Sequence, residues 1–198
     1  MKNYRYQSLF KVLSLTNSRG IKEKMQNNPR PLPIASTEGL KALKSIKLLC
    51  CDIDGVMTDG GMYYGPEGQI MVKFNVLDGI GIKLIQKIGI KTCFVTMSNT
   101  KIIQSRADVL GIDYCFMGIS DKRKKIEELT NELSINFNET AHIADDVNDL
   151  SLLEVVGCPV TVPNGVDEVK AAASYITSKA GGFGAVRELC DCLVKAQV

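Results

Sequence analysis

The feature that most constrains the fold is an alternation, from residue 46 onward, between short apolar runs and segments with apolar residues at helical spacing. The runs are Ile46–Cys51, Thr92–Thr96, Tyr114–Met117, Ala141–Ala144 and Pro159–Val162, with a further short run at Tyr175–Thr177. The helical patterns are Ile82/Ile85/Ile88, Ile103/Ala107/Leu110, Ile126/Leu129/Leu133 and the closing Val186/Leu189/Cys190/Leu193. Alternation of this kind predicts right-handed βαβ units. We therefore expect an α/β fold with a Rossmann-like, doubly wound, mainly parallel sheet covered by helices on both faces.

One insertion departs from that rhythm. The segment GMYYGPEGQIMVKFNV, Gly61–Val76, predicts two strands joined by a turn at Gly65–Gly68, which is a β-hairpin. Its apolar residues are Met62, Tyr63, Tyr64, Ile70, Val72 and Phe74, and they leave neither side of the ribbon polar. A free two-stranded ribbon is marginal in water, and an exposed apolar edge promotes aggregation. We therefore expect the hairpins of neighbouring subunits to cover one another in a closed homo-oligomer.

The N-terminal segment differs from the rest in charge. Residues 1–45 carry nine Lys and Arg against two acids, whereas the remaining 153 residues carry 15 against 20. The stretch NNPRPLPIAS, Asn27–Ser36, is typical of an extended linker because each proline disfavours helix before it. We predict a basic extension with a proline-containing linker over residues 1–45 and one domain over residues 46–198. A secretory signal is disfavoured because Lys11 interrupts the apolar run, whereas an organellar transit peptide stays open beside a solvated or partner-packed extension.

Several functional classes are excluded by pattern. No apolar run approaches the roughly 18 residues that a membrane helix needs. The seven cysteines include no CxxC pair, which favours reduced, packed thiols in a cytoplasmic protein over a disulfide or zinc framework. There is neither a GxxxxGK[ST] loop nor a GxGxxG motif to hold a nucleotide. We expect neither a membrane nor a nucleic-acid partner.

Two carboxylates follow the first apolar run, in the stretch LLCCDIDG. Asp52 and Asp54 are two residues apart, so on an extended chain they point the same way, with Cα atoms about 6–7 Å apart. Two such charges repel unless something positive lies near them. Taken alone, the pair has a structural explanation, because Asp54-Gly55 can form a turn and Asp52 can cap a helix.

Other strand ends carry polar side chains too. They are Thr96 in FVT, the acids Asp145, Asp146 and Asp149 in DDVND, and Lys122 in GISDK, at the start of a helix. In parallel sheets ligands bind beyond the carboxyl ends of the strands, where these groups would meet. Hard oxygen ligands in this arrangement suit Mg²⁺ with phosphate oxygens and water. For Lys122 the alternative is a solvated helix residue, as Arg123–Lys125 are expected to be.

Together these residues carry a resemblance to a known family. DIDGVMTDGG, the threonine of FVT, the lysine of SDK and the acidic DDVND resemble the four signature motifs of haloacid dehalogenase-type phosphatases. More narrowly, TDGGMYY, FNVLDGIGIK, GISDK, DDVNDL and GGFGAVRE are similar to the 3-deoxy-manno-octulosonate 8-phosphate phosphatase group, whose relatives act on nine-carbon sialic-type sugar phosphates. The resemblance covers residues 46–197. It implies the haloacid dehalogenase fold with a hairpin flap and no large cap domain.

The resemblance also implies a role for each motif residue. Asp52 would attack phosphorus and form an aspartyl-phosphate, and Asp54 would act as general acid and base. Mg²⁺ would be held by Asp52, the backbone carbonyl of Asp54 and Asp145. Thr96 and Lys122 would bind the phosphoryl oxygens. Asp146 and Asp149 would orient the metal ligands from behind.

The remaining implied roles concern substrate and assembly. In this group the hairpin helps to build a homotetramer in which a neighbouring subunit completes the active site. Asn75 and Asp78 would then approach the sugar. GGFGAVRE, Gly181–Glu188, would lie near an adjacent site, or else it is only a turn before the last helix. His142, the one histidine in the chain, is interpreted as structural.

Two positions depart from the family pattern. Met97-Ser98 stands where many members have glycine and arginine, and the resemblance implies that this arginine contacts the substrate. We therefore treat Ser98 as a substrate-binding position and expect weaker selection for the octulosonate, with room for a nine-carbon acid 9-phosphate. Ala144 replaces the usual glycine before the acidic pair, which we expect to leave the metal site intact.

Two classes of function compete. In one, the chain is a Mg²⁺-dependent phosphatase of an acidic keto-sugar phosphate in lipopolysaccharide or sialic acid synthesis. In the other, it is a non-catalytic oligomerisation module of the kind fused to acylneuraminate cytidylyltransferases, in which the acidic motifs have decayed. The acidic motif residues and Lys122 are all present here, which favours the enzyme.

Overall fold

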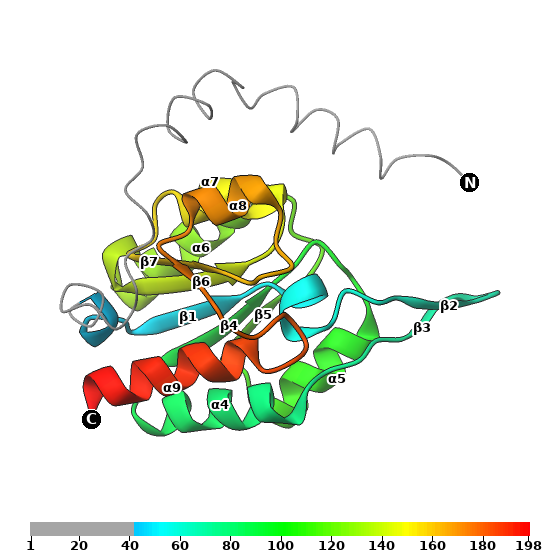
Figure 1. Cartoon of the computed structure of the whole chain (residues 1–198), viewed down its shortest axis with the longest axis horizontal. Helices are drawn as coiled ribbons and strands as arrows, with labels where there is room; N and C mark the ends of the chain where they lie inside the picture. The colour runs from blue at the N-terminus through cyan, green and yellow to red at the C-terminus, as the bar shows by residue number, and fades with distance from the viewer. Residues whose placement is uncertain (1–41) are drawn as a thin grey trace, which may run out of the picture. The chain divides into compact units, whose positions relative to one another are not determined.

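A parallel sheet lies at the centre of the computed structural model, which describes residues 42–198. Its strands are β1 (Leu48–Cys51), β4 (Lys91–Val95), β5 (Tyr114–Phe116), β6 (Thr140–Ala144), β7 (Cys158–Thr161) and β8 (Tyr175–Ile176). They are arranged in the order β5-β4-β1-β6-β7-β8, and every neighbouring pair is parallel (Figure 1). The expected sheet is confirmed, with strand ends that shift by at most two residues.

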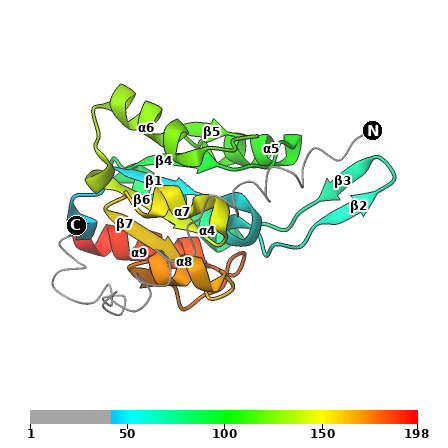
Figure 2. The same ribbon diagram turned by 90° about the horizontal axis from the view of Figure 1, so that it is seen from above.

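Helices cover both faces of this sheet. The helices α4 (Val76–Lys87), α5 (Lys101–Leu110) and α9 (Ala185–Gln197) lie on one face, below the sheet in Figure 1. The helices α6 (Lys122–Leu133), α7 (Leu150–Leu153) and α8 (Asp167–Ala172) lie on the other, and Figure 2 shows the layers from above. Short helical turns η2 (Phe137–Glu139) and η3 (Val147–Asp149) flank β6. This is the doubly wound arrangement that the alternating sequence predicts.

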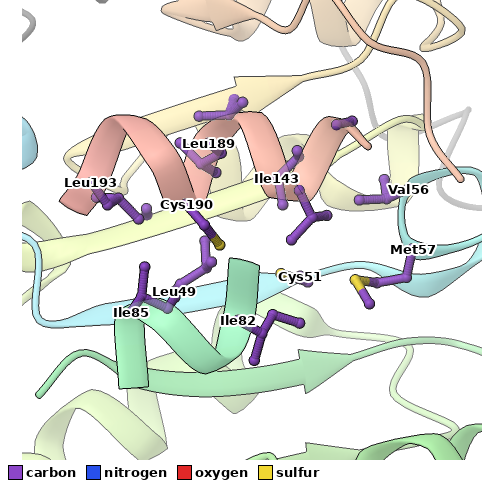
Figure 3. Packing of buried hydrophobic residues seen from close by; sticks show 14 of the residues in the cluster. Leu49, Cys51, Val56, Met57, Ile82, Ile85, Ile143, Leu189, Cys190 and Leu193 are labelled. Atoms are coloured by element: carbon purple, nitrogen blue, oxygen red, sulfur yellow. The ribbon is translucent and has the colours of Figure 1, made fainter. Parts of the chain in front are cut away.

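The central strand shows why a continuous apolar run suits this position. All four residues of β1 are buried, and successive side chains enter opposite layers. Leu49 and Cys51 pack in the cluster between β1, α4 and α9 (Figure 3), whereas Leu48 and Cys50 pack in the cluster beneath α6 and α7. A fully buried leucine contributes about 1.5–3 kcal/mol relative to an exposed one. β1 is therefore anchored from both sides, and its carboxyl end is a rigid platform.

The expected hairpin is present and stands apart from the sheet. It consists of β2 (Tyr63–Gly65) and β3 (Gly68–Met71), which pair antiparallel and project beyond the helices (Figures 1 and 2). Within residues 42–198 no further insertion forms a cap domain over the sheet. Tyr64 and Ile70 are 61% and 62% exposed, so the ribbon does not bury its apolar side chains within the described chain.

The first described residues already belong to the packed unit. Leu43 and Ile46 are buried in the main core, and the amide of Gln197 donates to both of their carbonyls, at 2.9 and 2.8 Å. The core thus includes Leu43, three residues before the expected domain start. Residues 1–41 of the expected extension lie outside the described residues. All seven cysteines fall within residues 42–198 as free thiols, and no helix in that range is long and apolar enough to cross a membrane.

Candidate active site

The chain turns sharply after β1, and this turn places the two aspartates. Asp52 follows the strand directly, and its backbone N–H donates to the carbonyl of Ile143 at 3.0 Å. The turn η1 (Ile53–Met57) contains Gly55 with a φ of +80°, a conformation that favours glycine. The hydroxyl of Thr58 accepts from the N–H of Gly55 at 3.2 Å and so closes the loop.

The position of Asp145 also leaves no room for a side chain at Gly55. A Cβ at this position would lie 2.0 Å from Oδ2 of Asp145, which follows β6. The absence of a side chain lets the Asp145 carboxylate approach the turn that carries Asp54. Two adjacent strands of the sheet, β1 and β6, therefore bring Asp52, Asp54 and Asp145 to one edge, as predicted.

A buried ammonium faces Asp52. Lys122 is the first residue of α6 and is fully buried, and its Nζ lies 2.8 Å from Oδ1 of Asp52 and 2.8–2.9 Å from both carboxylate oxygens of Asp149. Burial alone would lower the pKa of Lys122, but Asp52 and Asp149 outweigh it and hold the pKa above its usual value. The solvated alternative for Lys122 is wrong, whereas Arg123 and Lys124 beside it are exposed.

Asp149 supports Lys122 from behind. It is completely buried, and its Oδ1 lies 2.7 Å from Nε2 of His142, whose Nδ1 donates to the carbonyl of Cys50 at 3.1 Å. Burial favours a higher pKa for Asp149, but Lys122 and His142 lower it below its usual value. Asp149 thus contacts Lys122, and its expected orientation of metal ligands stays a prediction. The histidine–aspartate pair was not predicted, although the one histidine of the chain lies on the strand that leads to DDVND.

A third strand end contributes hydroxyl groups. Thr96 follows β4 and is buried, and its Oγ1 accepts from the N–H of Ser98 at 3.0 Å. The Ser98 hydroxyl donates to Oδ2 of Asp54. Ser98 was expected to contact substrate, and the structure directs its side chain at an aspartate of the site.

This edge of the sheet carries more carboxylates than cations. Burial, followed by the charges of Asp52 and Asp149, raises the pKa of Asp145 to about 8. Burial likewise raises the pKa of Asp52 to about 6, although Lys122 opposes the shift. Such repulsion is relieved by a cation placed between the carboxylates.

A hard divalent ion fits this donor set. Asp52, Asp145 and the backbone carbonyl of Asp54 offer oxygen ligands, the remaining positions being left for water and phosphate oxygens as Mg²⁺ prefers. Residues 42–198 contain no cluster of three or more His, Cys, Asp or Glu side chains arranged around one metal position. A site built from two carboxylates and a carbonyl is consistent with that finding.

Three other predicted residues are held by backbone groups. Asn75 begins α4, where its side chain accepts from the N–H of Leu77 at 2.9 Å and donates to the carbonyl of Gly182 at 3.2 Å. Asp78 is buried and accepts from the N–H of Arg187 at 2.8 Å, which joins α4 to the start of α9. Asp146 is exposed, and its carboxylate accepts from the N–H of Val147. Their expected roles toward sugar and metal stay predictions.

A contact that sequence reasoning missed joins the glycine-rich tail to the turn η1, which carries Asp54 and Gly55. The amide of Asn164 donates to the carbonyl of Gly55 and accepts from the N–H of Gly181, each at 2.8 Å. A Cβ on Gly181 would lie 1.8 Å from the carbonyl oxygen of Gly55. The tail therefore packs on the loop of its own chain, and its expected role at an adjacent subunit stays a prediction. The available signal was Pro163-Asn164-Gly165, a turn sequence directly after a strand.

Comparison with known proteins adds independent findings. A family model described as haloacid dehalogenase-like hydrolase matches residues 116–188. The chain is 37% identical over 165 residues to 3-deoxy-D-manno-octulosonate 8-phosphate phosphatase of Yersinia pestis, a match covering 83% of this chain and 88% of the relative. The corresponding phosphatase of Escherichia coli K12 is 36% identical over 162 residues, covering 82% of this chain and 86% of the relative.

Solved structures agree with these relatives. The 3-deoxy-D-manno-octulosonate 8-phosphate phosphatase from Moraxella catarrhalis, in complex with a magnesium ion, a phosphate ion and KDO, superposes with a TM-score of 0.79 at 38% identity. That match covers 81% of this chain and 92% of the other. A cobalt-bound deoxy-D-mannose-octulosonate 8-phosphate phosphatase from Haemophilus influenzae gives a TM-score of 0.77 at 33% identity, covering 79% and 91% of the two chains.

Proposed function

Because the chain belongs to the haloacid dehalogenase-like hydrolases, in the group of the 3-deoxy-D-manno-octulosonate 8-phosphate phosphatases, we propose that it hydrolyses the phosphate monoester of an acidic keto-sugar. The chain is a phosphoric monoester hydrolase, and Mg²⁺ is its cofactor. The observation that carries the proposal is the buried Lys122, whose ammonium contacts Asp52 and Asp149 at the edge that also bears Asp54 and Asp145. A module that had lost catalysis would gain little from keeping Lys122, Asp52 and Asp149 buried together, because withdrawing charges from water is costly even when they are paired.

The proposed reaction has two displacements. A carboxylate oxygen of Asp52 attacks phosphorus, and Asp54 gives its proton to the ester oxygen of the departing sugar. Asp54 then takes a proton from the water that hydrolyses the aspartyl-phosphate and so returns to its starting state. Lys122 and the hydroxyl of Thr96 bind phosphoryl oxygens as charge spreads over them. Asp52, Asp145 and the carbonyl of Asp54 would hold Mg²⁺, which when bound would neutralise phosphate charge next to the carboxylates.

The substrate proposed first is 3-deoxy-D-manno-octulosonate 8-phosphate. Support comes from the curated relatives and from the neighbour solved with phosphate and KDO. A nine-carbon sialic-type 9-phosphate is the second candidate, because Ser98 is shorter than the arginine common at this position and leaves room there. The place of the enzyme in lipopolysaccharide or sialic acid synthesis, and its cytoplasmic location, are predictions that follow from this choice.

Phosphate release from a substrate panel tests the proposal. The panel contains the eight-carbon 8-phosphate, a nine-carbon sialic-type 9-phosphate and glucose 6-phosphate, which has no carboxylate. We expect kcat/KM for one of the acidic keto-sugars to exceed that for glucose 6-phosphate by at least 100-fold. Equal rates on all three would contradict the acidic keto-sugar class, and no release from any of them would contradict phosphatase action on sugar esters.

We further propose a homotetramer that the hairpin helps to assemble. The apolar side chains of Met62, Tyr63, Tyr64, Ile70 and Met71 are all about half exposed or more. Such a ribbon is marginal alone, and symmetric packing of identical hairpins would cover it. Light scattering should give four times the chain mass of 21.6 kDa. A fully active monomer would show that the hairpin needs no partner.

A further inference from the structure

Ser98 occupies a fixed position beside Asp54. Its N–H donates to Oγ1 of Thr96 at 3.0 Å, and its carbonyl accepts from the N–H of Gly118, also at 3.0 Å. The backbone of Ser98 is therefore held on both sides, by the end of β4 and by the segment that follows β5. From this position its half-buried hydroxyl reaches Oδ2 of Asp54.

Little besides that contact fixes the orientation of the Asp54 side chain. It lies in the irregular turn η1 with φ −72° and ψ 122°, and its side chain is only partly buried. Within the described residues Ser98 is the one hydrogen-bond partner of the Asp54 carboxylate. Asp52, by contrast, is anchored by Lys122. A side chain without a partner at this edge would rotate among several rotamers.

We infer that Ser98 is a positioning residue, which holds the carboxyl group of Asp54 in the orientation needed for proton transfer. The inference rests on the proposed function and concerns its first displacement. In that step the bond from an Asp52 oxygen to phosphorus forms, the bond from phosphorus to the sugar oxygen breaks, and the Asp54 proton moves to that oxygen. The leaving oxygen becomes a neutral hydroxyl group of the sugar, and Asp54 is left as a carboxylate.

A hydroxyl suits both states of this cycle. The Ser98 hydroxyl donates to Oδ2 of Asp54, and that oxygen accepts the bond both in the carboxylate and in the acid whose proton is on the other oxygen, so the contact survives proton transfer. An arginine at the same position would add a positive charge, which favours the carboxylate over the protonated acid. Ser98 therefore steers Asp54 without opposing the protonated form that the first displacement requires.

Leaving-group dependence separates this role from a merely structural one. The term kcat/KM reports steps up to the first irreversible displacement, so it records acid assistance to the departing oxygen. A sugar alkoxide needs that proton, whereas the nitrophenolate of 4-nitrophenyl phosphate leaves without it. Removing the Ser98 hydroxyl should therefore lower kcat/KM for the sugar ester but not for the nitrophenyl ester.

The experiment compares Ser98→Ala, Ser98→Thr and wild type on octulosonate 8-phosphate and on 4-nitrophenyl phosphate. Loss of the hydrogen bond that orients the proton donor predicts a fall of about tenfold in kcat/KM for the sugar ester with Ser98→Ala. We expect less than a twofold change for the nitrophenyl ester. Ser98→Thr keeps a hydroxyl and should restore most of the loss. The matched control is Ser105→Ala, at an exposed position in α5, which should leave kcat/KM unchanged for both esters.

A double-mutant cycle completes the test. In an Asp54→Asn background Ser98→Ala should cause no further loss on the sugar ester, because Ser98 acts through the group already removed. Equal losses on both esters, or a full tenfold additional loss in the Asp54→Asn background, would overturn the positioning role while leaving the proposed function intact. A wild-type protein inactive on both esters would overturn the proposed function, and the role of Ser98 with it.

Discussion

The ammonium of Lys122 lies 2.8 Å from Oδ1 of Asp52, and both side chains are almost entirely withdrawn from solvent. A second carboxylate, Asp149, holds the same ammonium from the other side, and His142 holds Asp149. The cation is therefore placed before any phosphate arrives. Placing it in advance removes reorganisation from the chemical step, which is the main advantage of such electrostatic sites.

Replacing Lys122 with methionine should affect both catalysis and stability. Removing one partner of a buried ion pair leaves uncompensated charge, which costs about 3–5 kcal/mol in free energy of unfolding. Loss of a phosphoryl-binding cation should lower kcat by about 100-fold or more. Chemical denaturation and phosphate release measure the two effects. Because Asp149 is one of the two buried carboxylates that lose their ammonium partner, Lys122→Met/Asp149→Asn should recover part of the stability but none of the activity. An active Lys122→Met variant would remove Lys122 from the mechanism.

Asp52→Asn should abolish turnover without unfolding the protein. The amide keeps the shape of the side chain but cannot act as a nucleophile toward phosphorus. Steady-state assays should show a loss of at least 1,000-fold, with an unchanged circular dichroism spectrum. Asp121→Asn is a suitable control, since Asp121 is an exposed carboxylate that caps α6. Near wild-type turnover by Asp52→Asn would rule out the aspartyl-phosphate route.

Activity should require Mg²⁺ and stop when EDTA is added. Isothermal titration calorimetry should show that Asp145→Asn weakens Mg²⁺ binding by at least tenfold, because one of two carboxylate ligands is lost. The exposed Asp108 in α5 provides a control outside the site, and Asp108→Asn should bind Mg²⁺ less than threefold more weakly. Equal weakening by both substitutions would place the metal differently from the site described above.

Gly181→Ala should disturb the turn η1, although the two are far apart in the sequence. The added methyl would lie 1.8 Å from the carbonyl oxygen of Gly55, a backbone atom that can move only with the loop. We expect a loss of at least tenfold in kcat together with a lower melting temperature. Gly61→Ala is the matched change, because its methyl meets only the end of the Asp59 side chain, at 3.1 Å. If both variants behave alike, contact between the tail and the loop is unimportant for catalysis.

Glu188 should make stability depend on pH in the acid range. Burial favours a higher pKa for this carboxyl, but hydrogen bonds from Ser178, Tyr175 and Lys179 outweigh it and lower the pKa below its usual value. A carboxyl with a lowered folded-state pKa stabilises the fold above its unfolded pKa, and that contribution is lost as pH falls through the folded value. Glu188→Gln should therefore be less stable at pH 7 and lose less on acidification from pH 5 to 3. Melting temperatures that fall by the same amount in the two proteins between pH 5 and 3 would contradict this linkage.

Local pattern was sufficient to predict the strands and the groups at their ends. Asp52, Thr96, Lys122 and Asp145 each follow a short apolar run, and parallel strands bring their carboxyl ends to one edge whatever the order of the strands. The groups at this edge were predictable for this reason, whereas their catalytic roles were implied by the family resemblance and stay proposals. Their identity depends on residue type and on position relative to a strand, and both can be read from the chain itself.

The contacts between those groups were decided by tertiary structure. That His142 supports Lys122 through Asp149, that Ser98 reaches Asp54, and that Asn164 joins Gly55 to Gly181 all depend on which strands are neighbours and how each loop returns. These partners are up to 109 residues apart, so no periodicity of 2 or 3.6 residues records them. The sequence by itself determined which chemical groups this protein presents. Packing of β1 between two helical layers decided which of them touch, because only the folded sheet brings those strand ends within hydrogen-bond distance.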